Sequence, residues 1–403
     1  MLAPQLPYPP HQGTTLRNFN LIAHLARRHE VHLCCFAPAA PTPEIEPLRA
    51  YCTSITVVPQ PTRTWHQRLC TTLTSPRPDM AYRLATPAMH DELRRLLVHI
   101  RPEVIEFEGI EMIPYLSTVL AWIKGNPTPP LIVLDDHNAE YLLQKRVFES
   151  DIRVPRRWIG ALYSLIQWQK LARYEAWACR QADAVIAVSE QDAAALRRLV
   201  PGLQVTVVPN GVDVSVYAAF HHPTPLLPPH SLLFTGTMDF RPNVDAVLWF
   251  VEHVLERVRA AVPDVQFYIV GQRPHRRLDV LKGRPGIVIT GSVPDTRPYF
   301  ADADIYVIPL QSGGGTRLKV LEAMAMKKPI VSTTMGCDGY PLTPGHEAIL
   351  ADDPAQFAQA VIDLLNDPER RKALGEAGFV LAQRYDWANI VPQLEQVYSI
   401  RHA

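Results

Sequence analysis

The fold of this chain is decided by residues 305–325, which read IYVIPL, then QSGGGT, then RLKVLEAMA. The first six residues are an apolar, largely β-branched run typical of a buried strand, and the last nine indicate the start of a helix. Between them, Gly313, Gly314 and Gly315 leave backbone N–H groups open to a ligand because no Cβ stands in the way, and the helix adds its positive end. The loop, together with Thr316, is therefore predicted to cradle a phosphate.

The charges at this helix start support an anion site. Acidic residues usually complement the positive end of a helix, yet Arg317 and Lys319 add two cations there. An anionic ligand would compensate for them. The alternative is an ordinary strand-to-helix turn whose two cations are solvated.

Length and composition restrict the classes of protein. A chain of 403 residues predicts two domains, each with its own core. Lys plus Arg and Asp plus Glu both number 40, so no overall field favours nucleic acid or an acidic membrane surface as a partner, and any site for a polyanion must be local. The six cysteines show neither CxxC nor zinc-like spacing and are interpreted as buried free thiols of a reducing compartment. With no leader pattern and no apolar stretch of about 18 residues, a cytoplasmic protein is expected.

Strand-like runs alternate with helical patterns in two series, which predicts two doubly wound parallel sheets and an α/β fold. The first series comprises residues 104–107, 131–134, 184–188 and 205–208, and the second comprises 232–235, 266–270, 287–290, 305–310 and 330–332. Pro209-Asn210-Gly211 and the proline-rich stretch 223–229 have the composition of a connector, and we place the boundary near residue 212. In the first helix of the second series, residues 244–258 carry an apolar stripe expected to be core.

Two segments of the first series are less regular. Residues 1–4 resemble the end of a first strand, too short unless it lies at a sheet edge or the true start lies upstream. Residues 156–177 are aromatic, amphipathic and flanked by arginines. They indicate either a helix that covers the first sheet or a helix that lies on a membrane surface.

Ligands of doubly wound sheets bind beyond the carboxyl ends of the strands, and several candidates fall there. Gly13 opens the first helix, and Gly236-Thr237 follows the first strand of the second series. His137 follows residues 131–134, where it is either a site residue or an ordinary structural histidine. Glu106 and Glu108 lie at a similar strand end, where either could act as a base or cap a helix.

Glu322 lies within the helix that follows the glycine loop, where its carboxylate could accept two ribose hydroxyls or pair with Lys319 at i, i+3. A dinucleotide fingerprint fails because Leu318 stands where its third glycine is needed, and no GxxxxGK[ST] motif occurs. Dehydrogenase and P-loop functions therefore have little support.

Together these features resemble the retaining glycosyltransferases of family 4, with the GT-B fold, over nearly the whole chain. The matching segments are the loop at residues 3–13, Asp136-His137-Asn138, residues 184–190, residues 207–213, Gly291-Ser292-Val293 and residues 314–325. The resemblance implies two Rossmann-like domains facing across a cleft. Residues 1–211 would form the acceptor-side domain and 212–385 the nucleotide-sugar domain, and a helix at 386–403 would pack back onto the first.

The resemblance also implies roles for individual residues. Glu322 would hold the ribose of a nucleotide diphosphate sugar, and the backbone of Val293 would meet its base. The remaining donor-binding positions, against the sugar, the diphosphate or the hinge, would be Gly13, Asn210, Gly236, Thr237, Gly314, Gly315 and Thr316. His137 would act near the donor sugar, and Arg317 and Lys319 would stabilise the charge of the departing diphosphate.

Two positions depart from the family pattern. The family has a glutamate eight positions before the ribose-binding one, and this chain has Gly314 there. The usual Arg and Lys pair after the first strand of the second domain is reduced to Arg241. We therefore assign the diphosphate charge to Arg317 and Lys319.

The expected activity is a hexosyltransferase reaction that needs neither metal nor cofactor, because no Asp-x-Asp follows a strand. The donor would be a nucleotide diphosphate sugar, and the acceptor a glycan or lipid-linked glycan of cell-envelope or extracellular polysaccharide synthesis, with peripheral contact to the inner membrane face. The alternatives are a nucleotide-sugar epimerase of the same architecture and a non-catalytic glycan- or nucleotide-binding relative. The sugar, the base, the acceptor and the oligomeric state do not follow from the sequence.

Overall fold

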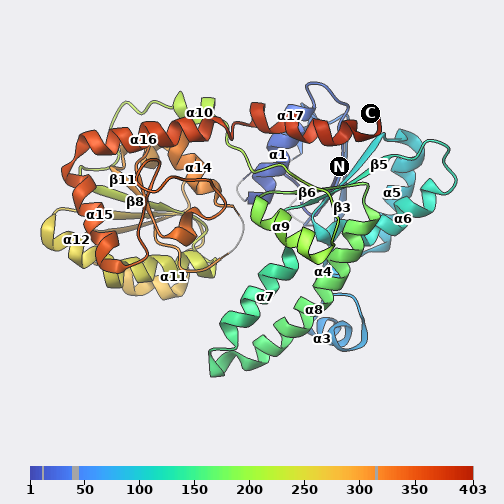
Figure 1. Ribbon diagram of the computed structural model, residues 1–403, viewed down its shortest axis with the longest axis horizontal. Helices are drawn as coiled ribbons and strands as arrows, with labels where there is room; N and C mark the ends of the chain where they lie inside the picture. The colour runs from blue at the N-terminus through green and yellow to red at the C-terminus, as the bar shows by residue number, and fades with distance from the viewer. Residues whose placement is uncertain (11–12, 39–44, 314–315, 403) are drawn as a thin grey trace. The chain divides into compact units, whose positions relative to one another are not determined.

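The computed structural model describes residues 1–10, 13–38, 45–313 and 316–402. The chain forms two compact units (Figure 1). The first comprises Met1–Pro209 together with Ile390–Ala403, and the second comprises Asn210–Asn389. The final helix, α17 (Trp387–Tyr398), thus begins in the second unit and ends in the first.

The first unit is built on a seven-stranded parallel sheet with the order β3-β2-β1-β4-β5-β6-β7. Its strands are β1 (Leu2–Ala3), β2 (His32–Ala37), β3 (Ser54–Pro59), β4 (Val104–Glu108), β5 (Leu131–Asp136), β6 (Ala184–Ala187) and β7 (Val205–Val207). All six residues of β5 are buried, as expected for a central strand covered on both faces.

The helices of this unit connect successive strands, with a short 3₁₀ segment at residues 110–115. They are α1 (Gly13–Leu25), α2 (Glu46–Arg49), α3 (Trp65–Thr74), α4 (Met80–Arg83), α5 (Pro87–Ile100), α6 (Leu116–Ile123), α7 (Glu140–Asp151), α8 (Trp158–Gln181) and α9 (Glu190–Leu199). The start of α9 shows how the sequence sets such boundaries, since the Ser189 side chain accepts a hydrogen bond from the Asp192 N–H at 3.1 Å. Helices α7 and α8 form a long hairpin that extends beyond the sheet (Figure 1).

The second unit is built on a six-stranded parallel sheet with the order β10-β9-β8-β11-β12-β13. Its strands are β8 (Ser231–Thr235), β9 (Gln266–Val270), β10 (Ile287–Gly291), β11 (Ile305–Ile308), β12 (Ile330–Ser332) and β13 (Ile349–Leu350). Its helices are α10 (Val214–Ala218), α11 (Arg241–Phe250), α12 (Glu256–Ala261), α13 (Arg297–Asp302), α14 (Leu318–Ala325), α15 (Pro354–Asn366) and α16 (Pro368–Gln383). A wider π-helical turn at residues 251–255 joins α11 to α12.

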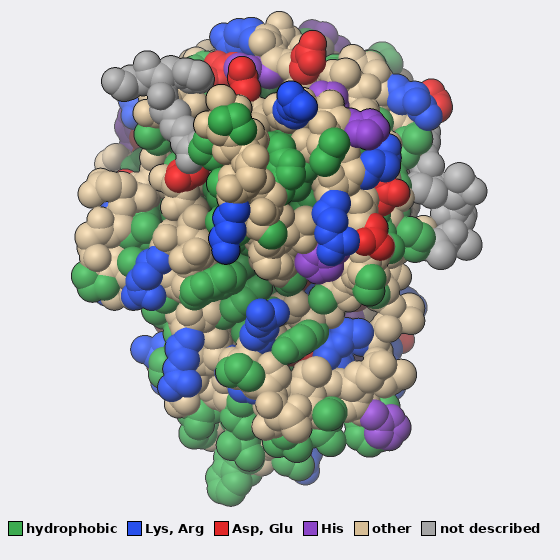
Figure 2. Space-filling view, turned by 90° about the vertical axis from the view of Figure 1, so that its right-hand side faces the viewer, with side chains coloured by type: hydrophobic (Ala, Val, Ile, Leu, Met, Phe, Trp, Pro, Cys, Tyr) green, Lys and Arg blue, Asp and Glu red, His purple; other side chains and the backbone are tan. Residues whose placement is uncertain are grey.

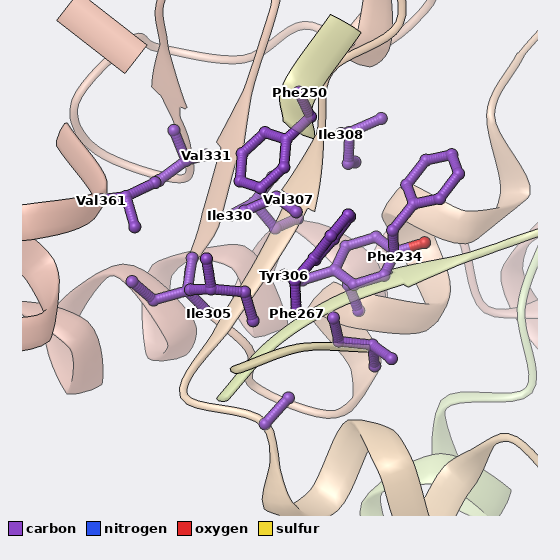
Figure 3. Close-up of a cluster of buried hydrophobic side chains, with 14 of the residues drawn as sticks. Phe234, Phe250, Phe267, Ile305, Tyr306, Val307, Ile308, Ile330, Val331 and Val361 are labelled. Carbon is purple, nitrogen blue, oxygen red and sulfur yellow. The ribbon is translucent and has the colours of Figure 1, made fainter. Parts of the chain in front are cut away.

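The core of the second unit lies between the sheet and these helices. Figure 3 shows Phe250 and Phe267 beside Tyr306 of β11. The ring centroids of Phe250 and Phe267 lie 4.6 Å apart. The apolar stripe predicted over residues 244–258 is confirmed as core: six of its residues are buried and Leu248 is partly buried against them. This packing holds the β8 and β11 strand ends in place.

Both sheets contain a point at which the chain reverses its direction of winding. It lies between β1 and β4 in the first sheet and between β8 and β11 in the second. Loops after these strands diverge and leave room for a ligand. The segments that follow β4, β8 and β11 are those in which the sequence placed candidate residues.

The structure corrects several expectations. The two-residue β1 pairs with both β2 and β4, so of the two explanations for its short length the edge position is wrong. The proline-rich stretch 223–229 lies within the second unit and does not join the two. Cys70 is exposed, whereas the other five cysteines are buried, and all six are free. Among the described residues, no helix is both long and apolar enough to cross a membrane.

The prediction that the aromatic helix covers the first sheet holds for only part of it. The second half of α8 is buried at Leu171, Tyr174 and Cys179. Its first half projects into the hairpin, where Trp158 and Ile159 are exposed.

Candidate functional site

The first-unit site consists of polar side chains at the ends of β4 and β5. Glu108 and Asp135 are direct neighbours in the parallel register of these strands, and His137 follows β5. The Nε2 atom of His137 lies 2.7 Å from Oε2 of Glu108. Glu108 is fully buried and His137 is 15% exposed, so the pair sits where the sheet meets solvent. Of the two predicted base candidates, Glu108 is the one in contact with the histidine.

Helix α1 adds a cation that the sequence did not single out. The guanidinium of Arg17 donates from Nη2 and Nε to Oδ2 of Asp135, at 2.6 and 3.1 Å, and from Nη1 to the Pro209 carbonyl at 3.1 Å. Arg17 is 1% exposed. Burial opposes its charge, but the negative charges of Asp135 and Glu108 outweigh that and raise the pKa of Arg17.

The electrostatics of this cluster favour the charged form of the histidine. Burial by itself lowers the pKa of His137, but the hydrogen bond to Glu108 and the charge of Asp135 reverse the effect and raise it. The Nε2–H donates to Glu108, which leaves Nδ1 as the second polar atom of the ring. No partner for that atom occurs among the described residues. His137 can therefore offer a ligand either a lone pair or, once protonated, an N–H donor.

A cavity of about 730 Å³ opens beside His137. Its apolar wall includes Leu6, Phe36 and Leu84, and its polar wall includes Glu111 and His137. A volume of this size matches a small-molecule ligand, and mixed walls suit a sugar, which has apolar faces and hydroxyl edges. Thr14 also lines this cavity, which places the predicted Gly13, the exposed first residue of α1, next to it along the chain.

The same cluster is the one candidate metal site that the described residues contain. Ligand atoms of Glu108, Asp135 and His137 lie within 4.8 Å of one another. However, Arg17 already binds Asp135 and neutralises part of the negative charge. A divalent cation would therefore lie next to a buried guanidinium that repels it, so the donor set does not fit a metal well.

The loop that carries His137 is anchored by a buried carboxylate that the sequence analysis missed. Both oxygens of Glu175, on α8, accept hydrogen bonds from the first N–H groups of α7, from Glu140 at 2.8 Å and from Tyr141 at 3.0 Å. Burial and the charge of Glu175 raise the pKa of Asp136 well above its usual range, and burial raises that of Glu175 to about 7. Both carboxyl groups therefore keep a proton to higher pH than an exposed acid does.

The second-unit site is centred on Lys319, in the first turn of α14. Its ammonium group donates to the Thr235 carbonyl at 2.6 Å and to Oδ1 of Asn243 at 3.1 Å, and it lies 4.2 Å from the ring centroid of Phe234. Burial, reinforced by the charge of Arg317, lowers the pKa of Lys319 to about 7. The predicted cation is therefore at the end of β8, and it is half neutral at pH 7.

Glu322 lies one turn further along α14. Its Oε1 accepts a hydrogen bond from the Tyr217 hydroxyl at 3.1 Å. No ion pair joins Glu322 to Lys319 in the described part of the chain, so the alternative of an i, i+3 helical pair is wrong. Burial raises the pKa of Glu322 despite the hydrogen bond from Tyr217. Its Oε2 atom has no partner among the described residues and is open to a hydroxyl donor.

Two close approaches shape the backbone at the end of β8. Gly236 has a φ of +154°, and a Cβ at this position would lie 2.8 Å from Nδ2 of Asn243 and 3.0 Å from Nζ of Lys319. A Cβ on Gly271, at the end of the neighbouring strand, would lie 1.7 Å from the Gly236 carbonyl oxygen. Glycine at both positions is therefore required by packing, and it lets the Lys319 ammonium reach the strand end.

The remaining predicted residues lie in the second unit, near the ends of β8, β10 and β11. Thr316 accepts a hydrogen bond from Nδ2 of Asn210 at 2.7 Å, and Arg317 occupies the position before the first residue of α14. Thr237 lies beside Gly236, and its carbonyl accepts from the Asn243 amide. Val293 packs on the core after β10, two strands away from β8. Gly314 and Gly315 lie outside the described residues, so the predicted phosphate cradle is described only at its two ends.

Comparison with known families matches both halves of the chain. The model described as "Glycosyltransferase Family 4" matches residues 12–216, just over half of the chain. The model described as "Glycosyl transferases group 1" matches residues 229–367. The first match covers strands β2 to β7 of the first unit, and the second covers all six strands of the second unit.

Among curated relatives, the "Phosphatidyl-myo-inositol mannosyltransferase" of Mycobacterium leprae is 26% identical over 328 residues, which cover 78% of each chain. The protein of the same name from Mycobacterium tuberculosis is 29% identical over 215 residues, 49% of this chain and 54% of that protein. An "Uncharacterized 44.6 kDa protein in cps region" of Klebsiella pneumoniae is 24% identical over 165 residues, 39% of this chain and 42% of that protein.

Solved structures share the fold over almost the whole chain. Sucrose-phosphate synthase from Thermosynechococcus elongatus superposes with a TM-score of 0.71 at 18% identity, covering 100% of this chain and 98% of that one. HepE of Anabaena, in complex with UDP and glucose, gives 0.66 at 14% identity, covering 99% and 98%. WaaG, described as a glycosyltransferase involved in lipopolysaccharide biosynthesis, gives 0.63 at 15% identity and 99% coverage of both chains.

Proposed function

The chain belongs to glycosyltransferase family 4, and we propose that it transfers a hexose from a nucleotide diphosphate sugar to a hydroxyl of a glycan or lipid-linked glycan, with retention at the anomeric carbon. One observation carries the choice of donor. A single helix, α14, presents a cation at its start and an acidic side chain one turn later, at Lys319 and Glu322. Their hydrogen-bond partners lie on other elements, the Thr235 carbonyl for Lys319 and the Tyr217 hydroxyl for Glu322.

The donor would use these two groups differently. The diphosphate would bind to Lys319 and Arg317. Their positive charges would stabilise the negative charge that grows on the diphosphate as its bond to the sugar breaks. The ribose hydroxyls would donate to the open oxygen of Glu322, and Tyr217 would hold the carboxylate in place. Thr316, Gly236 and the undescribed Gly314 and Gly315 would supply the rest of the phosphate contacts.

His137 would orient the donor sugar. Its hydrogen bond to Glu108 sets the ring plane and directs the second nitrogen toward a ligand. In this proposal the acceptor hydroxyl gives its proton to the leaving phosphate oxygen, and the cavity beside His137 receives the acceptor. The cavity's mixed apolar and polar walls support a glycan in that role.

Metal independence is part of the proposal. Charge neutralisation is assigned to Lys319 and Arg317, and the one candidate metal cluster contains the Arg17–Asp135 ion pair. We likewise propose that the reaction needs no cofactor. The named mannosyltransferase, capsule-region and lipopolysaccharide relatives support a role in cell-envelope or extracellular polysaccharide synthesis.

A panel of nucleotide diphosphate sugars tests this function directly. A donor at 100 times its dissociation constant should stabilise the protein by about 2.7 kcal/mol in a thermal-shift assay. The best donor is then incubated with glycan acceptors in EDTA, and the nucleotide diphosphate released is measured. The anomeric proton coupling of the product reports whether configuration is retained.

The outcomes separate the alternatives. Conversion of the donor to another nucleotide sugar, without release of nucleotide diphosphate, would identify an epimerase. Binding without turnover of any donor would identify a non-catalytic relative. Loss of activity in EDTA that magnesium restores would refute the metal-independent mechanism, and an inverted product would refute retention.

A further inference from the structure

The far end of the α7–α8 hairpin (residues 140–181) is an exposed apolar tip. Every residue from Ile152 to Gly160 is exposed. Ile159 is 90% exposed, Trp158 is 61% exposed and Ile152 is 48% exposed. Two such large apolar side chains next to each other at the end of a projecting hairpin are costly in water, since burying one of them is worth about 1.5–3 kcal/mol. We define residues 152–160 as the hairpin tip.

The hairpin tip is also cationic. It contains Arg153, Arg156 and Arg157, and the chain has no acidic residue between Asp151 and Glu175. One of the three arginines is paired, since Arg157 lies 3.3 Å from Asp151. Apolar side chains flanked by arginines form the combination that suits the boundary between lipid headgroups and acyl chains.

A second exposed apolar stripe lies on the neighbouring helix α3. Trp65, Leu69 and Leu73 are spaced four residues apart, so they share one face, and they are 66%, 51% and 71% exposed. The helix is fastened to α8 by hydrogen bonds to Thr72, from Gln167 at 3.2 Å and from Lys170 at 2.5 Å. In Figure 1 both α3 and the hairpin lie at the lower end of the first unit.

The surface view agrees with this composition. At the lower end of Figure 2, hydrophobic side chains gather at the surface, with Lys and Arg side chains above them. This is the end at which Figure 1 places α3 and the α7–α8 hairpin.

We propose that the hairpin tip, together with the apolar stripe of α3 further along α8, docks the protein onto an anionic lipid bilayer. Trp158 and Ile159 would enter the headgroup boundary, while the three arginines would bind lipid phosphates. The docking does not depend on which sugar is transferred, because it uses none of the residues assigned to donor or acceptor.

The charge of the hairpin tip indicates that it docks onto a bilayer and not onto a second copy of the chain. A two-fold contact places the same patch of both copies face to face. Asp151 pairs with Arg157 in each copy, so two hairpin tips would bring the remaining four arginines, Arg153 and Arg156 of both copies, together without acidic residues of the tip to balance them. An anionic membrane supplies the opposite charge, and it can accommodate a convex apolar tip.

Vesicle co-sedimentation of the full chain, without substrates, tests the proposal. The vesicles consist of phosphatidylcholine alone or of phosphatidylcholine with phosphatidylglycerol. Binding is expected to require the anionic lipid and to weaken as salt is raised from 0.1 to 0.5 M. Because no donor or acceptor is present, failure of docking is distinguishable from failure of the proposed transfer reaction.

Four variants identify the surface. Ile159→Ser should weaken binding by about tenfold, since it removes one inserted apolar side chain. The triple change Arg153→Gln, Arg156→Gln and Arg157→Gln should weaken it on the order of a hundredfold, at about fivefold for each arginine. The matched controls lie on the second unit: Val280→Ser for the apolar change, and Arg257→Gln, Arg276→Gln and Arg284→Gln together for the charge. Both controls should bind as the parent does.

The proposal is overturned if the parent chain binds neither kind of vesicle, or if the hairpin and control variants lose binding equally. It is also overturned if Ile159→Ser leaves vesicle binding intact but changes the sedimentation velocity, because the tip would then join two copies. Unchanged thermal unfolding of each variant confirms that the loss of binding does not reflect misfolding. Leu73→Ser tests the α3 stripe in the same assay, with a smaller loss expected.

Discussion

The protonation of Lys319 should control how tightly the protein binds its donor. The side chain is held by the Thr235 carbonyl and the Asn243 amide at the end of β8, and burial lowers its pKa to about 7. A diphosphate beside the amine would stabilise its charged form and raise that pKa again. Donor binding should therefore take up protons, and the affinity should fall as the pH rises.

The size of the effect follows from the lowered pKa. With a pKa of about 7, the charged fraction of Lys319 is about three-quarters at pH 6.5 and about 3% at pH 8.5. If only the charged form binds the diphosphate, affinity should fall about 25-fold over this range, or ~1.9 kcal/mol. The ligand-free protein should respond in the opposite direction. Its unfolded state binds this proton up to pH 10.5, so the Lys319 contribution to stability rises from pH 7 to 10.5.

Isothermal titration calorimetry with the best nucleotide sugar measures both quantities. Titrations at pH 6.5, 7.5 and 8.5 give the affinity, and two buffers of different ionisation enthalpy give the proton uptake, about half a proton at pH 7. Lys319→Gln should bind weakly and lose the pH dependence. Lys328→Gln is the matched control, because Lys328 also has a pKa lowered by burial, to about 8. Its ammonium binds the Ala301 and Ala303 carbonyls, at the opposite end of the strands.

A flat affinity between pH 6.5 and 8.5 in the parent chain would refute this reasoning. So would an unchanged pH slope in Lys319→Gln, because the titrating group would then be another residue. If Lys328→Gln lost the slope as well, the pH dependence would arise from stability and not from the phosphate contact.

Four further changes have definite expected outcomes. Glu322→Ala should weaken donor binding by about 1.5–3 kcal/mol without unfolding the protein, and an unchanged calorimetric affinity would exclude a ribose contact. Glu108→Gln should lower the pKa of His137, measured by the NMR titration of its ring protons, because it replaces a negatively charged acceptor with a neutral one. His137→Ala should reduce kcat by about a hundredfold while nucleotide affinity stays within about threefold, and an undiminished kcat would make the histidine structural. Arg17→Met should lower the free energy of unfolding by about 3–5 kcal/mol in urea titrations, since it leaves Asp135 buried without its partner.

Much of the fold is local enough to follow from the sequence. The strands predicted from β-branched runs, such as residues 131–134 and 305–310, are all present, because alternating strand and helix patterns admit few arrangements. Strand β3, with Ser54-Ile55-Thr56-Val57-Val58-Pro59, carried the same signal and was overlooked. Strand β2 has two cysteines and no β-branched residue, so its neighbours in the sheet decide its conformation.

The sequence predicted where along the chain the candidate site residues lie, but it did not predict which groups they contact. Strand ends and helix starts are read from local periodicity, which placed His137, Gly236 and Lys319 correctly at the carboxyl edges of the two sheets. The excess charge at the start of α14 led only to the expectation of an anion. In the structure, the Lys319 ammonium also binds a carbonyl that is 84 residues away along the chain.

Partners so distant in sequence leave no periodic trace in it. Arg17 and Asp135 are 118 residues apart, Tyr217 and Glu322 are 105 apart, and Glu140 and Glu175 are 35 apart. Residue order and hydrophobic spacing determined the two parallel sheets and the strand ends at which the candidate residues lie. Only tertiary packing decided which buried charges face each other, because desolvation and the neighbouring charges that set each pKa depend on distances in space and not along the chain.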